Sequence, residues 1–102
     1  MLTHLGKIFR SLGQYSWNEW VYIERTDVRD SETKCLVLNP DNAELGSDDF
    51  TPEPVERLDM VEFLSVQDLV SVKENLLRQK PEATISDMCN AAVYYFDNDA
   101  FI

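Results

Sequence analysis

The chain has 102 residues, of which 44% are hydrophobic and 27% are charged, and its formal net charge at pH 7 is −10. This length and composition predict a single folded domain over residues 1–102 whose core needs no metal or disulfide, and they exclude a wholly disordered chain. The charge argues against binding to nucleic acid or to an anionic membrane and favours a cationic protein partner. Acidity that serves only solubility is the alternative.

The first predicted element is an amphipathic helix over residues 2–12 that ends at Gly13. Its apolar side chains recur at helical spacing: Leu2, Leu5, Ile8, Phe9 and Leu12. Lys7 and Arg10 lie on the other side, so we expect the apolar side to pack in the core rather than on a membrane surface. The two bases also interrupt any apolar run long enough for a signal peptide, and no run of ~20 apolar residues could span a bilayer. We therefore expect a cytoplasmic protein.

Three strands are predicted after this helix. Residues 19–25 alternate β-branched with aromatic or charged side chains, which is typical of a half-buried strand. Residues 35–39 are apolar on both faces, which predicts a central strand that is covered on both sides. The third strand is predicted at residues 59–64, where an acidic segment gives way to apolar side chains.

An aromatic group surrounds the first of these strands and consists of Tyr15, Trp17, Trp20 and Tyr22. Aromatic side chains bury a large apolar area, so we expect this group to lie in the core. Tryptophan and tyrosine are also enriched at protein interfaces, and an interface anchor is the alternative.

Two helices complete the predicted fold, over residues 65–79 and residues 85–96. Each begins at a capping-box pattern in which aspartate takes the place of the usual glutamate. Residues 97–99 are predicted to end the second helix, and the apolar residues 100–102 are expected to dock on the domain. The pattern as a whole predicts an α+β domain in the order α-β-β-β-α-α. Its antiparallel or mixed sheet has about three strands and packs with three helices.

Nothing in the sequence matches a catalytic or metal-binding motif. Cys35 and Cys89 are far apart and flanked by apolar residues, and there is one histidine, which predicts two buried reduced thiols without a metal or a cofactor. The three isolated glycines exclude a Walker loop, a Gly-x-Gly-x-x-Gly loop and a nucleophile elbow. We therefore predict that the protein is not an enzyme, and a hydrolase that uses paired carboxylates is the alternative.

Most of the excess negative charge lies in residues 41–62, where eight acidic residues and one arginine give a net charge of −7. We expect residues 41–54 to form an exposed loop and the remainder to enter the third strand. Asp97 and Asp99 each oppose the dipole of the last helix by ~0.3–1 kcal/mol, which suggests a role in binding. The predicted partner-binding residues form a composite acidic face: Asp41, Glu44, Asp48, Asp49, Glu53, Glu56, Asp59, Glu62, Asp97 and Asp99.

Three segments of the chain resemble a family of small acidic bacterial proteins, the immunity proteins of contact-dependent growth inhibition and related toxin systems. They are WNEWVYI at residues 17–23, CLVLNPDN at residues 35–42 and residues 64–102, in which KPEAT and YYFDNDAF are the most specific parts. The resemblance covers nearly the whole chain. It implies an immunity protein that binds the C-terminal toxin domain of an effector and blocks it, without a catalytic motif and with no toxin-contacting residue to transfer.

We expect the toxin domain to be a nuclease, because a nuclease needs a cationic cleft for phosphates and an acidic protein can occupy that cleft. The alternative is an acidic nucleic-acid mimic that inhibits another DNA- or RNA-binding protein. An immunity protein protects against one toxin, whereas a mimic inhibits unrelated nucleic-acid-binding proteins.

Overall fold

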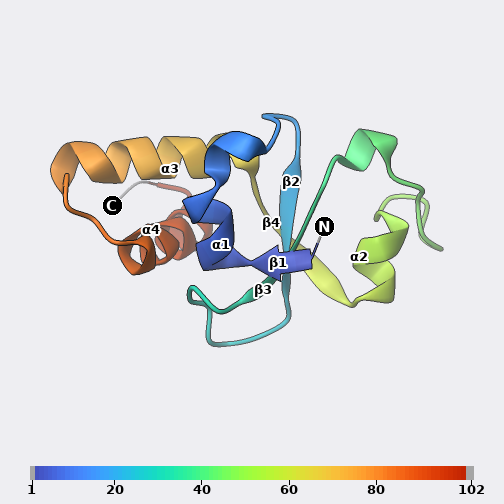
Figure 1. Cartoon of the computed structure of the whole chain (residues 1–102). Helices are drawn as coiled ribbons and strands as arrows, with labels where there is room; N and C mark the ends of the chain where they lie inside the picture. The colour runs from blue at the N-terminus through green and yellow to red at the C-terminus, as the bar shows by residue number, and fades with distance from the viewer. Residues whose placement is uncertain (1, 101–102) are drawn as a thin grey trace.

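The computed structural model describes residues 2–100, which form an antiparallel sheet of four strands in the order β1-β3-β2-β4 and four α-helices. The strands are β1 (Leu2–His4), β2 (Trp20–Glu24), β3 (Lys34–Leu38) and β4 (Met60–Ser65). The helices are α1 (Leu5–Arg10), α2 (Glu53–Arg57), α3 (Val66–Gln79) and α4 (Ile85–Asn98). In Figure 1 the sheet stands between α1, α3 and α4 on one side and the short α2 on the other. The predicted α+β class is confirmed, with one strand and one helix more than expected.

The additional strand is β1, at the start of the segment that we predicted as one helix over residues 2–12. It pairs antiparallel with β3, and Leu2 lies opposite Leu36. Helix α1 begins only at Leu5, and a 3-10 turn follows at Leu12–Gln14. The helical spacing predicted the wrong element at the first three positions. Pairing with the open edge of β3 satisfies the backbone groups there, and side-chain spacing does not report such pairing.

Alternation along the strands divides their side chains between two faces of the sheet. The main core, under α1, α3 and α4, contains the odd-numbered strand residues Val21, Ile23, Cys35 and Val37. Tyr22 and Leu36 lie on the opposite face, where they pack with Met60 and with Val55 of α2 in a smaller cluster. The prediction that residues 35–39 form a central strand covered on both faces is therefore confirmed for β3.

A bulge separates two parts of the pairing between β2 and β4. Tyr22 lies opposite Glu62, whereas Trp20 lies opposite Ser65, so β4 has one residue more than β2 between these pairs. Both β4 residues inside the bulge are buried in the main core. The bulge thus lets β4 bury two consecutive apolar side chains while Glu62 stays exposed beside Tyr22 on the other face.

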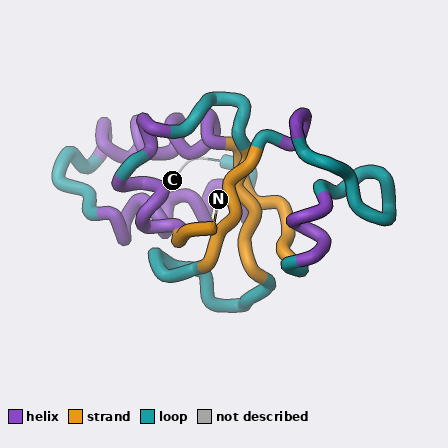
Figure 2. The backbone as a smooth tube through the Cα atoms, turned by 45° about the vertical axis from the view of Figure 1, so that its right-hand side comes forward, coloured by secondary structure: helices purple, strands orange, loops and turns teal. Residues whose placement is uncertain are grey.

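The acidic segment is more ordered than its composition predicts. Residues 41–54, which we expected to be a loop, include most of a 3-10 turn at Pro40–Asn42 and the start of α2. Pro52 precedes α2 and Pro54 lies in its first turn, where the fixed φ of proline favours a helix. Val55 is 2% exposed and fastens α2 to the sheet. The intervening loop and α2 extend away from the strands in Figure 2.

Both predicted capping boxes are present at the starts of α3 and α4. Ser65 Oγ accepts a hydrogen bond from the backbone N–H of Asp68 at 3.0 Å, and Thr84 Oγ1 accepts one from Asp87 at 3.1 Å. Each aspartate accepts the N–H of its capping residue in return. Helix α4 extends two residues beyond its predicted end. Of the tail predicted to dock, residues 101–102 lie outside the described part of the chain.

Cys35 and Cys89 are buried free thiols, as the sequence predicts. Burial raises the pKa of Cys35 to about 12 and the pKa of Cys89 to about 11. Both thiols therefore stay protonated near neutral pH and are poor nucleophiles. They act as small apolar side chains of the main core.

Candidate protein-binding groove

The face of the sheet that carries α2 is only partly covered, and a groove of ≈ 610 Å³ lies along it. Strands β2 and β4 contribute one set of lining side chains, which includes Trp20, Tyr22 and Met60. The other set comes from residues 41–59, which we call the acidic lobe, and it includes Phe50 and Val55. The groove therefore lies where the acidic lobe meets the sheet, and it has an aromatic and apolar component.

The charged side chains of the groove are Asp48, Glu56, Asp59, Glu62 and Arg25. Four carboxylates and one guanidinium give the groove a net charge of −3. The sequence predicts that all four carboxylates lie on one acidic face, and in the structure all four line a single groove. Arg25, which the sequence analysis did not single out, lies among them because β2 ends one residue before it.

Two groove carboxylates hold the acidic lobe in shape. Asp48 accepts hydrogen bonds from the backbone N–H and the hydroxyl of Thr51, at 2.8 and 2.7 Å, and from the backbone N–H of Phe50. The bonds from Thr51, followed by the one from Phe50, lower the pKa of Asp48 below its ordinary value of 3.8. Glu56 accepts hydrogen bonds from the backbone N–H and the hydroxyl of Ser47 at 2.9 and 2.8 Å. Both carboxylates order the loop before α2 through these hydrogen bonds.

The other two groove carboxylates differ in their partners. Asp59 accepts a hydrogen bond from Arg25 Nε at 2.9 Å, in an ion pair whose two side chains are largely exposed. Glu62 is exposed on β4, opposite Tyr22, and makes no hydrogen bond or ion pair through its side chain within residues 2–100. Burial, with a smaller contribution from the charge of Glu62, raises the pKa of the Tyr22 phenol. Glu62 is thus a carboxylate fixed by the sheet and free to accept a donor from outside.

Four predicted partner-binding residues belong to the acidic lobe but do not line the groove. They are Asp41, Glu44, Asp49 and Glu53. The first three are exposed, and Glu53 is half-buried. Glu53 lies 3.7 Å from Arg57 in an i,i+4 ion pair on α2. Asp49 has a positive φ of 62° in the turn before Phe50. These carboxylates add to the charge of the lobe without forming part of a concave site.

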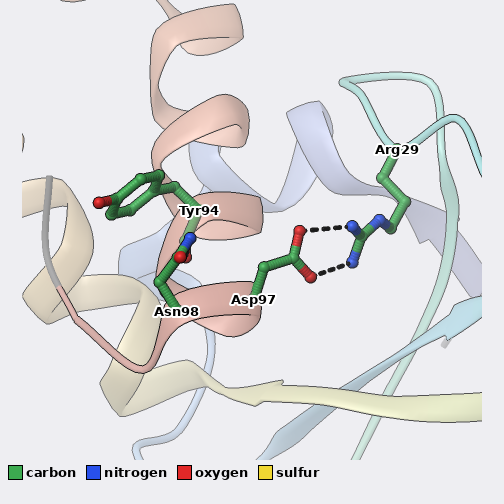
Figure 3. Close-up of polar contacts among 4 residues, drawn as sticks. All are labelled: Arg29, Tyr94, Asp97 and Asn98. Carbon is green, nitrogen blue, oxygen red and sulfur yellow. Dashed lines mark hydrogen bonds and ion pairs between the residues drawn. The ribbon is translucent and has the colours of Figure 1, made fainter.

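Asp97 and Asp99, at the end of α4, are not among the residues that line the groove. Figure 3 shows the Asp97 carboxylate facing the guanidinium of Arg29, with two hydrogen bonds of 3.0 and 2.6 Å. The same guanidinium lies 6.0 Å from the ring centroid of Phe96. Asp99 ends α4 with a left-handed conformation at φ 52°. The carboxylate of Asp97 therefore fastens the loop between β2 and β3 to α4, and an external partner would have to compete for it.

The aromatic group around β2 is divided between the core and the surface. Tyr15, Trp17, Trp20 and Tyr22 were expected in the core, with an interface anchor as the alternative; Tyr22 is buried, Tyr15 and Trp20 are half-buried, and Trp17 is 73% exposed. Trp20 is half-buried and lines the groove. Phe50 was not considered, although an aromatic side chain within a charge-rich segment is a signal of a contact surface, and it is 86% exposed.

Two further properties concern the part of the chain from residue 2 to residue 100. No group of three or more histidine, cysteine, aspartate or glutamate side chains there is arranged to hold a metal ion. None of the helices formed by these residues has the length and apolar character needed to cross a bilayer.

Comparison with known proteins gives a family but no function. A family model described as "Domain of unknown function (DUF7716)" matches residues 2–102, so the chain belongs to this family. Neither the curated proteins nor the solved structures include a significant match.

Proposed function

We propose that this member of the DUF7716 family is an inhibitor that binds a basic protein partner through the groove between the sheet and the acidic lobe. The observation that carries the proposal is the composition of the groove: a net charge of −3 beside aromatic and apolar side chains. Specific interfaces combine aromatic anchors with complementary charge, and this groove offers both.

The partner that we propose is the C-terminal toxin domain of a bacterial effector. The support for this choice is the resemblance of residues 17–23, 35–42 and 64–102 to immunity proteins, together with the negative charge of the groove. A nuclease is the toxin class that suits the groove best, because the cleft that holds phosphates is cationic and complements it. Inhibition of this kind needs neither a catalytic group nor a cofactor, and it acts in the cytoplasm, where the toxin reaches its target.

The lobe and the sheet contribute to binding in different ways. The lobe carboxylates attract a basic partner over roughly one Debye length, which is ~8 Å at physiological ionic strength, and so accelerate association. Trp20 and Glu62 are held by the sheet, so they lose little conformational freedom on binding and supply most of the specificity.

Co-expression with the C-terminal domain of a large secreted protein, taken from a neighbouring gene that encodes one, tests the proposal. We expect the two proteins to co-purify, cells to survive the toxin, and the association rate to fall as salt is added. A protein that neither co-purifies with that domain nor protects cells contradicts the proposal. Inhibition of unrelated DNA-binding proteins would instead identify a nucleic-acid mimic.

A further inference from the structure

We infer that the groove binds an arginine side chain of the partner, with the guanidinium placed against Trp20 and Phe50 and hydrogen-bonded to Glu62. The inference rests on the proposed function and names the chemical group that the groove selects. It draws on three features of the groove: its aromatic side chains, its unpaired carboxylate and the position of its own arginine.

The aromatic side chains come from both sides of the groove. Trp20 lies on the groove face of β2, where it is half-buried above the buried ring of Tyr22, while Phe50 comes from the acidic lobe. The electron-rich faces of such rings attract cations, and tryptophan attracts them most strongly. Phe50 is 86% exposed, so a side chain that covers it removes apolar surface from water.

Glu62 supplies the negative charge at the sheet side of these rings. It lies opposite Tyr22 in the register of β2 and β4, and none of the residues from 2 to 100 donates a hydrogen bond to its side chain. The other groove carboxylates already accept hydrogen bonds, as described above for Asp48, Glu56 and Asp59. Glu62 is therefore the one groove carboxylate without a partner among residues 2–100, and it lies next to the aromatic side chains.

A guanidinium fits this combination better than an ammonium. It is planar, stacks on aromatic rings and presents paired N–H donors to a carboxylate, whereas an ammonium is a compact and strongly hydrated charge. The same protein holds a guanidinium in this way at another place. Arg29 donates two hydrogen bonds to Asp97 (Figure 3). The same guanidinium lies 6.0 Å from the ring centroid of Phe96.

The arginine of the groove itself does not fill this position. Arg25 pairs with Asp59, and its side chain is 62% exposed, which places it at the rim. An exposed ion pair of this kind contributes at most about 1 kcal/mol to stability. It is therefore too weak to keep another cation out of the groove. A partner arginine can enter beside it.

Binding of blocked tripeptides tests the inference without the partner. The chain has two tryptophans, so the Trp17→Phe variant leaves Trp20, in the groove, as the only tryptophan. Ac-Gly-Arg-Gly-NH₂ is titrated into this variant, and Trp20 fluorescence and the backbone amide NMR shifts of Tyr22 and Glu62 are followed. Matched tripeptides carry lysine or citrulline in place of arginine.

We expect the arginine tripeptide to bind more tightly than the lysine tripeptide, and the citrulline tripeptide to bind least. Glu62→Gln should weaken arginine binding about tenfold, the loss of one charge-assisted hydrogen bond, while the matched control Glu74→Gln on the exposed side of α3 leaves it unchanged. Phe50→Ala should weaken it as well, while Val28→Ala, at a 70% exposed position outside the groove, has no effect.

The inference is overturned if citrulline or lysine binds as well as arginine, or if shift changes do not involve the groove. Its failure can be told apart from failure of the proposed function. A protein that binds the toxin domain but discriminates no arginine tripeptide refutes only the arginine assignment. A protein that selects arginine but protects against no toxin refutes only the proposed partner.

Discussion

Asp97 and Glu62 show how two carboxylates with the same sequence-level prediction differ in the folded protein. Asp97 is held by the bidentate guanidinium of Arg29, whose side chain is only 22% exposed. Glu62 is exposed on a strand, beside aromatic side chains, and has no hydrogen-bond or ion-pair partner within residues 2–100. An acidic residue whose charge is satisfied inside the molecule contributes to stability, whereas one that the fold leaves unpaired in a groove is available to a partner.

Charge reversal at Glu62 should distinguish the groove from the Arg29–Asp97 pair most strongly. We expect Glu62→Lys to weaken binding of the toxin domain about 100-fold, because a like charge at an electrostatically matched interface costs about 2–3 kcal/mol. The free energy of unfolding should change by less than about 0.5 kcal/mol, since the side chain is exposed and makes no hydrogen bond or ion pair within residues 2–100. Isothermal titration calorimetry and urea denaturation measure the two quantities. Unchanged binding would remove Glu62 from the interface.

Asp97→Asn should have the opposite profile. Loss of the bidentate ion pair leaves the largely buried guanidinium of Arg29 without its partner, which should lower the free energy of unfolding by about 1–2 kcal/mol. Toxin binding by the folded protein should stay within twofold of the wild type. The matched control is Asp99→Asn, because asparagine tolerates the left-handed conformation at this position and should leave stability unchanged. Urea denaturation of the wild type, Asp97→Asn and Asp99→Asn measures these stabilities. Equal stability of all three would show that the Arg29–Asp97 pair does not stabilise the fold.

Arg25→Gln should strengthen binding of a basic partner by about two- to threefold. The substitution removes the positive charge from the groove and frees Asp59, and the lost exposed ion pair contributes at most about 1 kcal/mol to stability. The measurement is the association rate at low and high salt, where the gain should shrink as salt screens the groove. A weaker complex would mean that Arg25 itself contacts the partner.

The smallest expected effect is a loss of stability in acid that comes from protonation of Asp48 and Asp87. Hydrogen bonds from Thr51 and Phe50 lower the pKa of Asp48, and bonds from Thr84 and Lys80 lower the pKa of Asp87, in both cases below the ordinary value of 3.8.

A carboxyl group whose pKa is lowered by folding stabilises the folded state above its unfolded pKa, and this contribution is lost as pH falls through the folded pKa. Stability should therefore decline as pH falls below about 4, and Asp48→Asn and Asp87→Asn should each flatten that decline. Unfolding monitored by circular dichroism between pH 7 and pH 2 measures it, and parallel pH profiles for wild type and variants would contradict the assignment.

Local sequence patterns predicted the elements whose signals are contained within a few residues. The capping boxes at Ser65 and Thr84 located both long helices to within a residue at their starts, and the apolar run after Lys34 gave the central strand. The α+β class followed from the order of these elements. The starts of α3 and α4 were predictable because a cap and its first turn interact over only three residues.

Elements set by distant contacts were not predictable in the same way. Strand β1 forms because Leu2 pairs with the edge of β3, and α2 forms because Val55 packs into an apolar cluster on the sheet. The Arg29–Asp97 pair joins residues 68 positions apart, so no local pattern shows that Asp97 already has an ion-pair partner. The composition of the acidic segment predicted its charge but not which carboxylates would share a groove with aromatic side chains.

Hydrogen–deuterium exchange of the protein with and without the bound toxin domain tests most directly whether the groove is the binding surface. We expect new protection in β2, in the acidic lobe and in β4, and no change at the loop and α4 residues that Arg29 and Asp97 connect. Protection confined to that loop and the end of α4, with the groove segments exchanging as in the free protein, would contradict the assignment of the groove.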